Sequence, residues 1–143
     1  METKLNEAEI AEFLEQVFPQ VRGEFVIEEV RPLYARVRMS VSERHLRPGG
    51  TISGPSMFGL ADVSFYIATL AMIGREALTV TTNLNINFLR KPEPVDLIGE
   101  ARILKFGKLL ATGDVTIYSQ GSDRPVAHAT TTYAIPPKKE APA

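Results

Sequence analysis

The chain has 143 residues, and its 16 Lys and Arg against 17 Asp and Glu give a formal net charge of −1. This length is typical of a single domain. The balanced charge argues against a general nucleic-acid binder, which needs an excess of basic residues. The absence of Cys excludes disulfides, thiolate metal sites and a cysteine nucleophile. Only His45 and His128 are available as histidine ligands, so we expect no metal.

The N-terminal segment METKLNEAEI contains acidic residues and no apolar core, so it predicts neither a secretory signal nor a transit peptide. We therefore expect a cytoplasmic protein. Residues 6–18 carry their apolar side chains on one helical face, which predicts an amphipathic helix. Asn6 and Glu9 have the spacing of a capping box, and Pro19 marks the end of this helix.

Six segments are predicted strands, and in two of them, residues 33–41 and 80–89, side chains alternate between two faces with a period of two. The six segments are residues 25–30, 33–41, 80–89, 96–106, 108–119 and 125–135. Simple alternation in 80–89 places Thr81 on the same face as the asparagines at 83, 85 and 87. Residues 136–143 have no apolar periodicity, so we expect a disordered tail after a single α+β domain at residues 1–135.

Residues 56–73 form a long apolar segment whose single charge is Asp62. Gly54-Pro55 favours a helix start, because proline tolerates the first helical position, and Gly74 favours the end. The polar residues within the segment favour a buried central helix over a membrane span, so we expect no membrane association. Its Met and aromatic side chains have the spacing of core residues.

Asp62 is unusual because burying a carboxylate costs free energy unless it is hydrogen-bonded or functional. In a purely structural role it would cap a loop or pair with Arg47 or Arg75. Gly54 precedes it by eight residues, on roughly the same side of the helix and about 12 Å away along the axis. The helix N-terminus offers free N–H groups to an oxyanion. This combination indicates acyl chemistry, in which the aspartate facing Gly54 could belong to a second subunit.

The run GGTISGPSMFGLADVSFY resembles the helix-entry motif of the PaaI-like acyl-CoA thioesterases. The pattern of that family is N-x-x-G-x-x-H-G-G, followed by a helix containing L-A-D. The resemblance spans about residues 20–135 and implies the hotdog fold, an antiparallel curved sheet wrapped around one long central helix. It also implies hydrolysis of an acyl-CoA to a free acid and CoA, with CoA as part of the substrate and without a metal or redox cofactor.

Residue by residue, the resemblance makes Asp62 the catalytic carboxylate, acting as general base or nucleophile. The Gly54 N–H becomes the oxyanion donor, and Thr81 helps to hold the water. Two departures concern substrate binding: Arg47 replaces the asparagine of the family, and Ser53 replaces its histidine. Because a guanidinium prefers carboxylates and phosphates, Arg47 would either bind a carboxylated acyl group or neutralise Asp62.

Further candidates for substrate binding are Arg90, Lys105 and Lys108, since relatives bind the CoA phosphates with basic side chains in these regions. Charges at strand ends can equally serve to protect sheet edges. Asn83, beside Thr81, is expected to line a neutral tunnel for the pantetheine arm.

The resemblance implies a homodimer or homotetramer with its sites at the subunit interface, and a flat Thr/Asn strand fits such an interface. One alternative is a non-catalytic acyl-CoA-binding module in which Arg47 has disabled Asp62. Another is a structural protein in which Asp62 is a buried polar anchor. The sequence does not identify the acyl group.

Overall fold

The computed structural model of the chain describes residues 1–21 and 23–137. The predicted disordered tail lies outside the described residues from position 138 onward. The elements, in chain order, are α1 (Glu7–Val17), the 3-10 turn η1 (Pro19–Val21), β1 (Phe25–Arg31), β2 (Tyr34–Met39), the 3-10 turn η2 (Glu43–His45), α2 (Gly54–Ile73), β3 (Val80–Phe88), β4 (Leu97–Phe106), β5 (Leu110–Ser119) and β6 (Pro125–Ala134).

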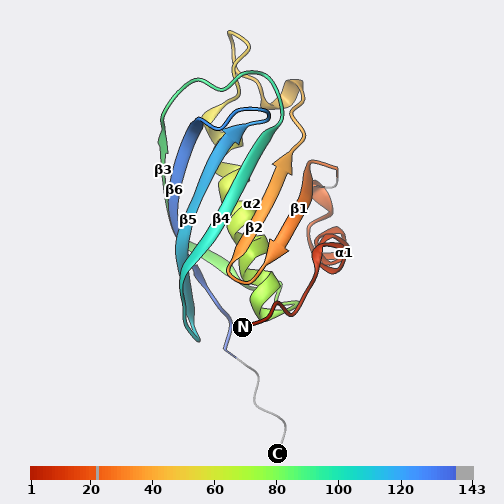
Figure 1. Cartoon of the computed structure of the whole chain (residues 1–143). Helices are drawn as coiled ribbons and strands as arrows, with labels where there is room; N and C mark the ends of the chain where they lie inside the picture. Colours follow the sequence, from red (N-terminus) through yellow and green to blue (C-terminus); the bar gives the residue numbers. More distant parts are fainter. Residues whose placement is uncertain (22, 138–143) are drawn as a thin grey trace, which may run out of the picture.

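The six strands form one antiparallel sheet in the order β1-β2-β4-β5-β6-β3, which curves around α2. Figure 1 shows α1 beside β1 at one edge of the sheet and β3 at the other edge. The predicted α+β architecture, with a curved sheet around a long central helix, is confirmed.

α2 is apolar on nearly every side, and the sheet buries most of it. By length and composition this helix could cross a membrane, but 61% of its most apolar stretch is buried inside the protein. Its two buried hydroxyls are satisfied within the helix, since Ser64 donates to the Leu60 carbonyl and Thr69 to the Phe65 carbonyl. α2 is therefore the core helix, as the sequence predicted.

A glycine of the sheet allows α2 to pack closely against β5. A Cβ added at Gly113 of β5 would lie 1.9 Å from the Arg102 carbonyl oxygen and 2.8 Å from the Phe65 ring. The first of these atoms belongs to the backbone of the neighbouring strand, so it cannot move aside without disturbing the sheet. Glycine at this position lets the fully buried Phe65 ring contact the strand directly.

α1 is fixed to the rest of the fold by its beginning. Asn6 and Glu9 form the predicted capping box. The Glu7 carboxylate accepts a hydrogen bond from the Val30 N–H of β1 at 3.0 Å, and the Lys4 N–H donates to the Ala71 carbonyl of α2 at 2.7 Å. These bonds tie the N-terminal segment both to the sheet edge and to the last turns of α2.

A bulge in β3 changes the expected orientation of one residue. The register of β3 on β6 shifts between Thr81 and Asn83, so Thr81 pairs with the inward-facing Tyr133 while Asn83 pairs with Thr132 on the outer face. The prediction that Thr81 shares a face with the asparagines was wrong, because a bulged residue breaks the alternation. Thr81 faces α2, and the asparagines point away from it.

Substitution of Gly113 by Ala should lower the free energy of unfolding by about 3 kcal/mol, because the added methyl overlaps a backbone oxygen. Gly59, in the first half of α2, is the matched control because its added Cβ would meet nothing within 4 Å. Gly59→Ala should raise the free energy of unfolding by about 0.5–1 kcal/mol through helix propensity. Urea denaturation of both variants checks this, and equal effects would contradict the proposed close approach.

Candidate active site

The Asp62 carboxylate lies where α2 faces the beginning of β3 and the end of β6. Its Oδ1 atom accepts a hydrogen bond from the Thr81 hydroxyl at 2.6 Å and from the Tyr133 hydroxyl at 2.5 Å. The Tyr133 hydroxyl also lies 2.8 Å from the Asp62 backbone carbonyl oxygen. Within the described residues Oδ2 has no hydrogen-bond partner. One oxygen is therefore held in place, and the other is available to a ligand.

Tyr133 is a site residue that the sequence did not reveal. It is 3% exposed, and its ring lies 6.0 Å from that of Tyr66 and 5.5 Å from that of Phe65. Burial, followed by the nearby Asp62 charge, raises the pKa of the Tyr133 phenol well above its usual range. The hydroxyl therefore stays protonated and serves as a donor. The packing of α2 against β6, which is non-local, brings Tyr133 to Asp62.

A cavity of about 330 Å³ opens beside Asp62. The end of α1 forms one wall, α2 the floor and β3 the other wall. Its lining residues are mostly apolar or hydroxyl-bearing: Val17, Phe18, Asp62, Val63, Tyr66, Ala77, Thr79, Val80, Thr81 and Tyr133. We call this space the Asp62 cavity.

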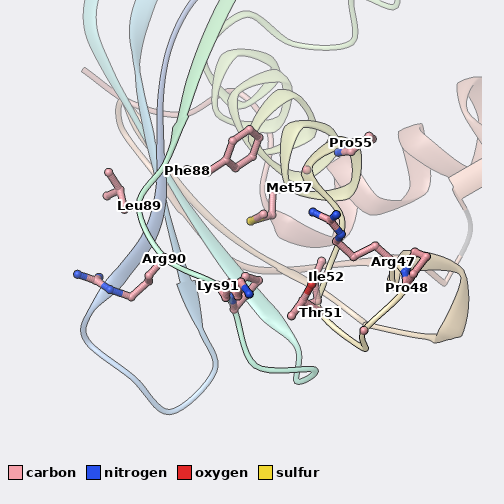
Figure 2. A pocket seen from close by; sticks show the side chains of 13 residues that line it. Arg47, Pro48, Thr51, Ile52, Pro55, Met57, Phe88, Leu89, Arg90 and Lys91 are labelled. Carbon is pink, nitrogen blue, oxygen red and sulfur yellow. The ribbon is translucent and has the colours of Figure 1, made fainter.

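A second cavity, of about 790 Å³, lies at the N-terminus of α2, and Figure 2 shows its lining. It is formed by the loop before α2, the first turn of α2 and the segment after β3. The lining residues are Arg47, Pro48, Gly49, Thr51, Ile52, Gly54, Pro55, Met57, Phe88, Leu89, Arg90, Lys91 and Pro92. We call this space the Gly54 cavity.

Gly54 is the first residue of α2, following the cap formed by Ser53, whose hydroxyl accepts from the Ser56 N–H. The Gly54 N–H makes no hydrogen bond with any described residue, so it is a free donor at the positive end of the helix dipole. A Cβ at this position would lie 3.2 Å from the Phe88 ring of β3. Ser53 therefore caps the helix start that carries the donor, and the Phe88 ring packs beside Gly54.

The loop that carries Arg47 is held in a compact turn. The Arg47 carbonyl accepts from the Gly50 N–H, and the Arg47 N–H donates to the Thr51 carbonyl. Gly49 and Gly50 have φ of 100° and 80°, which favours glycine at both. The buried His45 supports this loop, since its Nδ1 accepts from the Ser42 N–H at 2.9 Å and its carbonyl accepts from the Ser53 N–H.

The basic side chains at the Gly54 cavity do not all point the same way. Figure 2 shows the Arg47 guanidinium extending toward the start of α2, whereas Arg90 extends away from it. Arg90 donates a hydrogen bond to the carbonyl of Pro125, the first residue of β6. Lys91, which was not among the predicted binding residues, lines the cavity together with Arg90. Within the described part of the chain, no carboxylate lines this cavity.

The structure does not bring the other predicted binding residues to either cavity. Lys105 lies on β4 and Lys108 in the β4–β5 turn, at the projecting hairpin seen in Figure 1. Asn83 lies on the outer face of β3. Arg47 does not contact Asp62 of its own chain, and Gly54 and Asp62 stand about 12 Å apart along α2. The two halves of the candidate site are therefore separate within one chain.

The family model of the thioesterase superfamily matches residues 49–126, which include α2 and most of the sheet. The chain therefore belongs to the thioesterase superfamily, whose hotdog fold it has. A crystal structure of a protein described as a "putative thioesterase" from Silicibacter sp. TM1040 is 54% identical, with a TM-score of 0.89 over 96% of each chain.

More distant relatives agree on the fold. The phenylacetic acid degradation protein PaaI of Thermus thermophilus is 24% identical, with a TM-score of 0.70 over 81% of this chain and 97% of its own. A Saccharolobus solfataricus protein named "putative esterase SSO1253" is 29% identical over 123 residues, which cover 83% of this chain and 79% of that protein. At the level of the family, the superfamily match and the Silicibacter and Saccharolobus proteins support a hydrolase.

The raised pKa of Tyr133 predicts a loss of stability in alkali. Above about pH 10 an unfolded tyrosine loses its proton while the folded Tyr133 keeps it. The free energy of unfolding should therefore fall by about 1.4 kcal/mol per pH unit on account of this residue. Tyr133→Phe should remove this part of the slope between about pH 10 and 11.5 in urea titrations. An unchanged slope would show that the phenol ionises normally in the folded protein.

Proposed function

We propose that the protein is an acyl-CoA thioesterase, which hydrolyses a thioester to a free acid and CoA. The observation that carries this proposal is the fixed Asp62 carboxylate with one free oxygen, together with the free Gly54 N–H at the start of the same helix. The first supplies a base or nucleophile, and the second supplies an oxyanion donor.

In the proposed reaction, Oδ2 of Asp62 takes a proton from water while the water oxygen attacks the thioester carbon. The carbonyl oxygen becomes negative and is stabilised by the Gly54 N–H. The C–S bond then breaks, and the proton passes to the CoA thiolate. Alternatively, Oδ2 attacks the carbon directly and the C–S bond breaks to release the CoA thiolate; water then hydrolyses the resulting anhydride, which frees Asp62 and the acid and supplies a proton to the thiolate. Both routes need only water and these groups, so the proposal includes no metal or redox cofactor.

A second copy of the chain would bring the two halves together. β3 is an edge strand, paired only with β6. If two β3 strands pair antiparallel about an axis near Leu84, Thr81 of one chain lies near the end of the partner's β3, which carries Phe88. Asp62, held by Thr81, then approaches the partner's Gly54, which packs beside Phe88. The proposed enzyme is therefore at least a homodimer with shared sites, while a homotetramer and a cytoplasmic location stay predictions.

We assign the CoA portion of the substrate to the Gly54 cavity. Arg47 and Lys91 line this cavity, and no described carboxylate competes for them. A guanidinium and an ammonium suit the phosphates of CoA. In this arrangement Arg47 binds the substrate rather than disabling Asp62, which favours the enzyme over a non-catalytic binding module.

Asp62→Asn should lower kcat/KM for thiol release by about 10²–10⁴-fold, the usual contribution of a general base. The assay would use phenylacetyl-, hydroxybenzoyl-, hexanoyl-, lauroyl- and succinyl-CoA, and the chain has no Cys to add background. Asp123→Asn, at an exposed turn, is the control and should be fully active. No turnover by the native chain, with CoA esters still raising its melting temperature, would favour the binding module.

Substituting both Asn83 and Asn85 by Lys should weaken the dimer. An axis near Leu84 places each of these residues opposite the other in the partner, so like charges would face each other across the interface. We expect the dissociation constant in sedimentation to rise at least about tenfold and activity to fall on dilution. Thr130→Lys, on the same outer face but on β6, is the control. A native chain that sediments as a monomer would contradict the shared site.

A further inference from the structure

We infer that the Asp62 cavity is the acyl-group pocket and that it selects neutral, apolar acyl groups of medium length, with Phe18 setting the length limit. This inference rests on the proposed function. It follows from four properties of the cavity: its position, its charge, its size and the origin of its far wall.

The position assigns the two sides of the thioester. The reacting carbon must lie within reach of Oδ2 of Asp62, directly or through one water, and its carbonyl oxygen must accept from a Gly54 N–H. CoA, with its phosphates, fits the basic Gly54 cavity, so the acyl group must extend in the other direction. The Asp62 cavity is the space that opens on that side.

The charge of the cavity excludes acidic acyl groups. Among its described lining residues Asp62 alone is charged, and no cation offsets it. A second carboxylate in this space would be repelled by Asp62 and would lose its hydration. The guanidinium that could have bound it, Arg47, lies in the other cavity. Of the two earlier expectations for Arg47, a partner for a carboxylated acyl group is therefore disfavoured.

The volume of the Asp62 cavity limits the length of the acyl group. At about 30 Å³ for each water-sized group, a volume of 330 Å³ holds roughly ten non-hydrogen atoms. An octanoyl or phenylacetyl group has this size. Val63, Tyr66 and Val80 give the pocket an apolar lining. Thr79 adds a buried hydroxyl that has no partner in the described part of the chain.

The wall of the Asp62 cavity formed by α1 lies outside the residues that the family model matches. Val17 and Phe18, at the end of α1, close the cavity, whereas the family model begins at residue 49. Each of these side chains is 40% exposed, although both are large and apolar. Filling the cavity with an acyl chain would cover them. The N-terminal helix thus supplies a specificity-determining wall on a common scaffold.

The test measures kcat/KM for acetyl-, butyryl-, hexanoyl-, octanoyl-, dodecanoyl-, phenylacetyl- and succinyl-CoA. We expect a rise of about fourfold per methylene up to roughly eight carbons, then no further gain. Succinyl-CoA should be at least about tenfold poorer than butyryl-CoA, which has the same number of carbons. Equal or better use of succinyl-CoA would overturn the inference without affecting the proposed thioesterase activity.

Phe18→Ala should move the optimum to longer chains and raise the dodecanoyl-to-hexanoyl ratio by about tenfold. Phe18→Trp should move it the other way. Phe58→Ala is the matched control, because Phe58 is also 40% exposed and lines neither cavity. An unchanged ratio in both Phe18 variants would overturn the inference. A raised dimer dissociation constant with an unchanged ratio would show that Phe18 contacts a second copy instead.

Acyl-group selection by the Asp62 cavity can also be measured as binding, which does not require that a thioester is hydrolysed. Thioether analogues of the same CoA esters, in which the carbonyl is a methylene, should raise the melting temperature of the native chain in the same order of acyl groups. If these shifts follow the order and Phe18→Ala changes it, the pocket assignment holds while the proposed catalysis fails. Equal shifts for every analogue would overturn the assignment.

Discussion

The structure depends on one constraint: a 20-residue helix that is apolar on nearly every side must be enclosed by a single six-stranded sheet. A sheet can curve around a helix, but it cannot surround it completely. The close contact between Gly113 and Phe65 places the helix against the concave side of the sheet. The side left uncovered carries Asp62, the one charged residue of the helix, and there the end of α1 and the beginning of β3 form the rims of a cavity.

The same helix separates the two groups that acyl chemistry needs. Its first N–H is free because the first turn of any helix lacks internal acceptors. Its carboxylate lies two turns further on, in a different cavity with a different chemical character. One cavity is basic and large, and the other is mostly apolar and small. A thioester has the same division, with a polyanionic carrier on one side and an acyl group on the other.

Local patterns in the sequence were sufficient for much of this description. The capping box at Asn6, the glycine–proline entry at Gly54 and the isolated charge at Asp62 each depend on residues close together in the chain, and the structure places all of them as expected. The hotdog fold followed from the resemblance of one motif, and the family comparison confirmed it.

The features of the site that could not be predicted from the sequence depend on contacts between distant segments of the chain. Alternation alone put Thr81 on the wrong face, because a bulge is fixed by the register of β3 on β6. Tyr133 reaches Asp62 because α2 packs on β6, across 71 positions of the chain. The choice of Lys91 over Lys105 and Lys108 depends on where loops fold back, which charge patterns do not encode.

The contact between Tyr133 and Asp62 has a consequence for the identity of the acid. The phenolic oxygen lies within hydrogen-bonding distance of both the main-chain carbonyl oxygen and Oδ1 of the same residue. The single methylene of aspartate spans the separation between these two acceptors. A glutamate has one more methylene, which would move its carboxyl group away from the Thr81 and Tyr133 hydroxyls. We expect it to lose the hydrogen bonds that fix one oxygen and to rotate more freely. Aspartate and glutamate are nearly equal as bases in water, but in this protein they are not interchangeable.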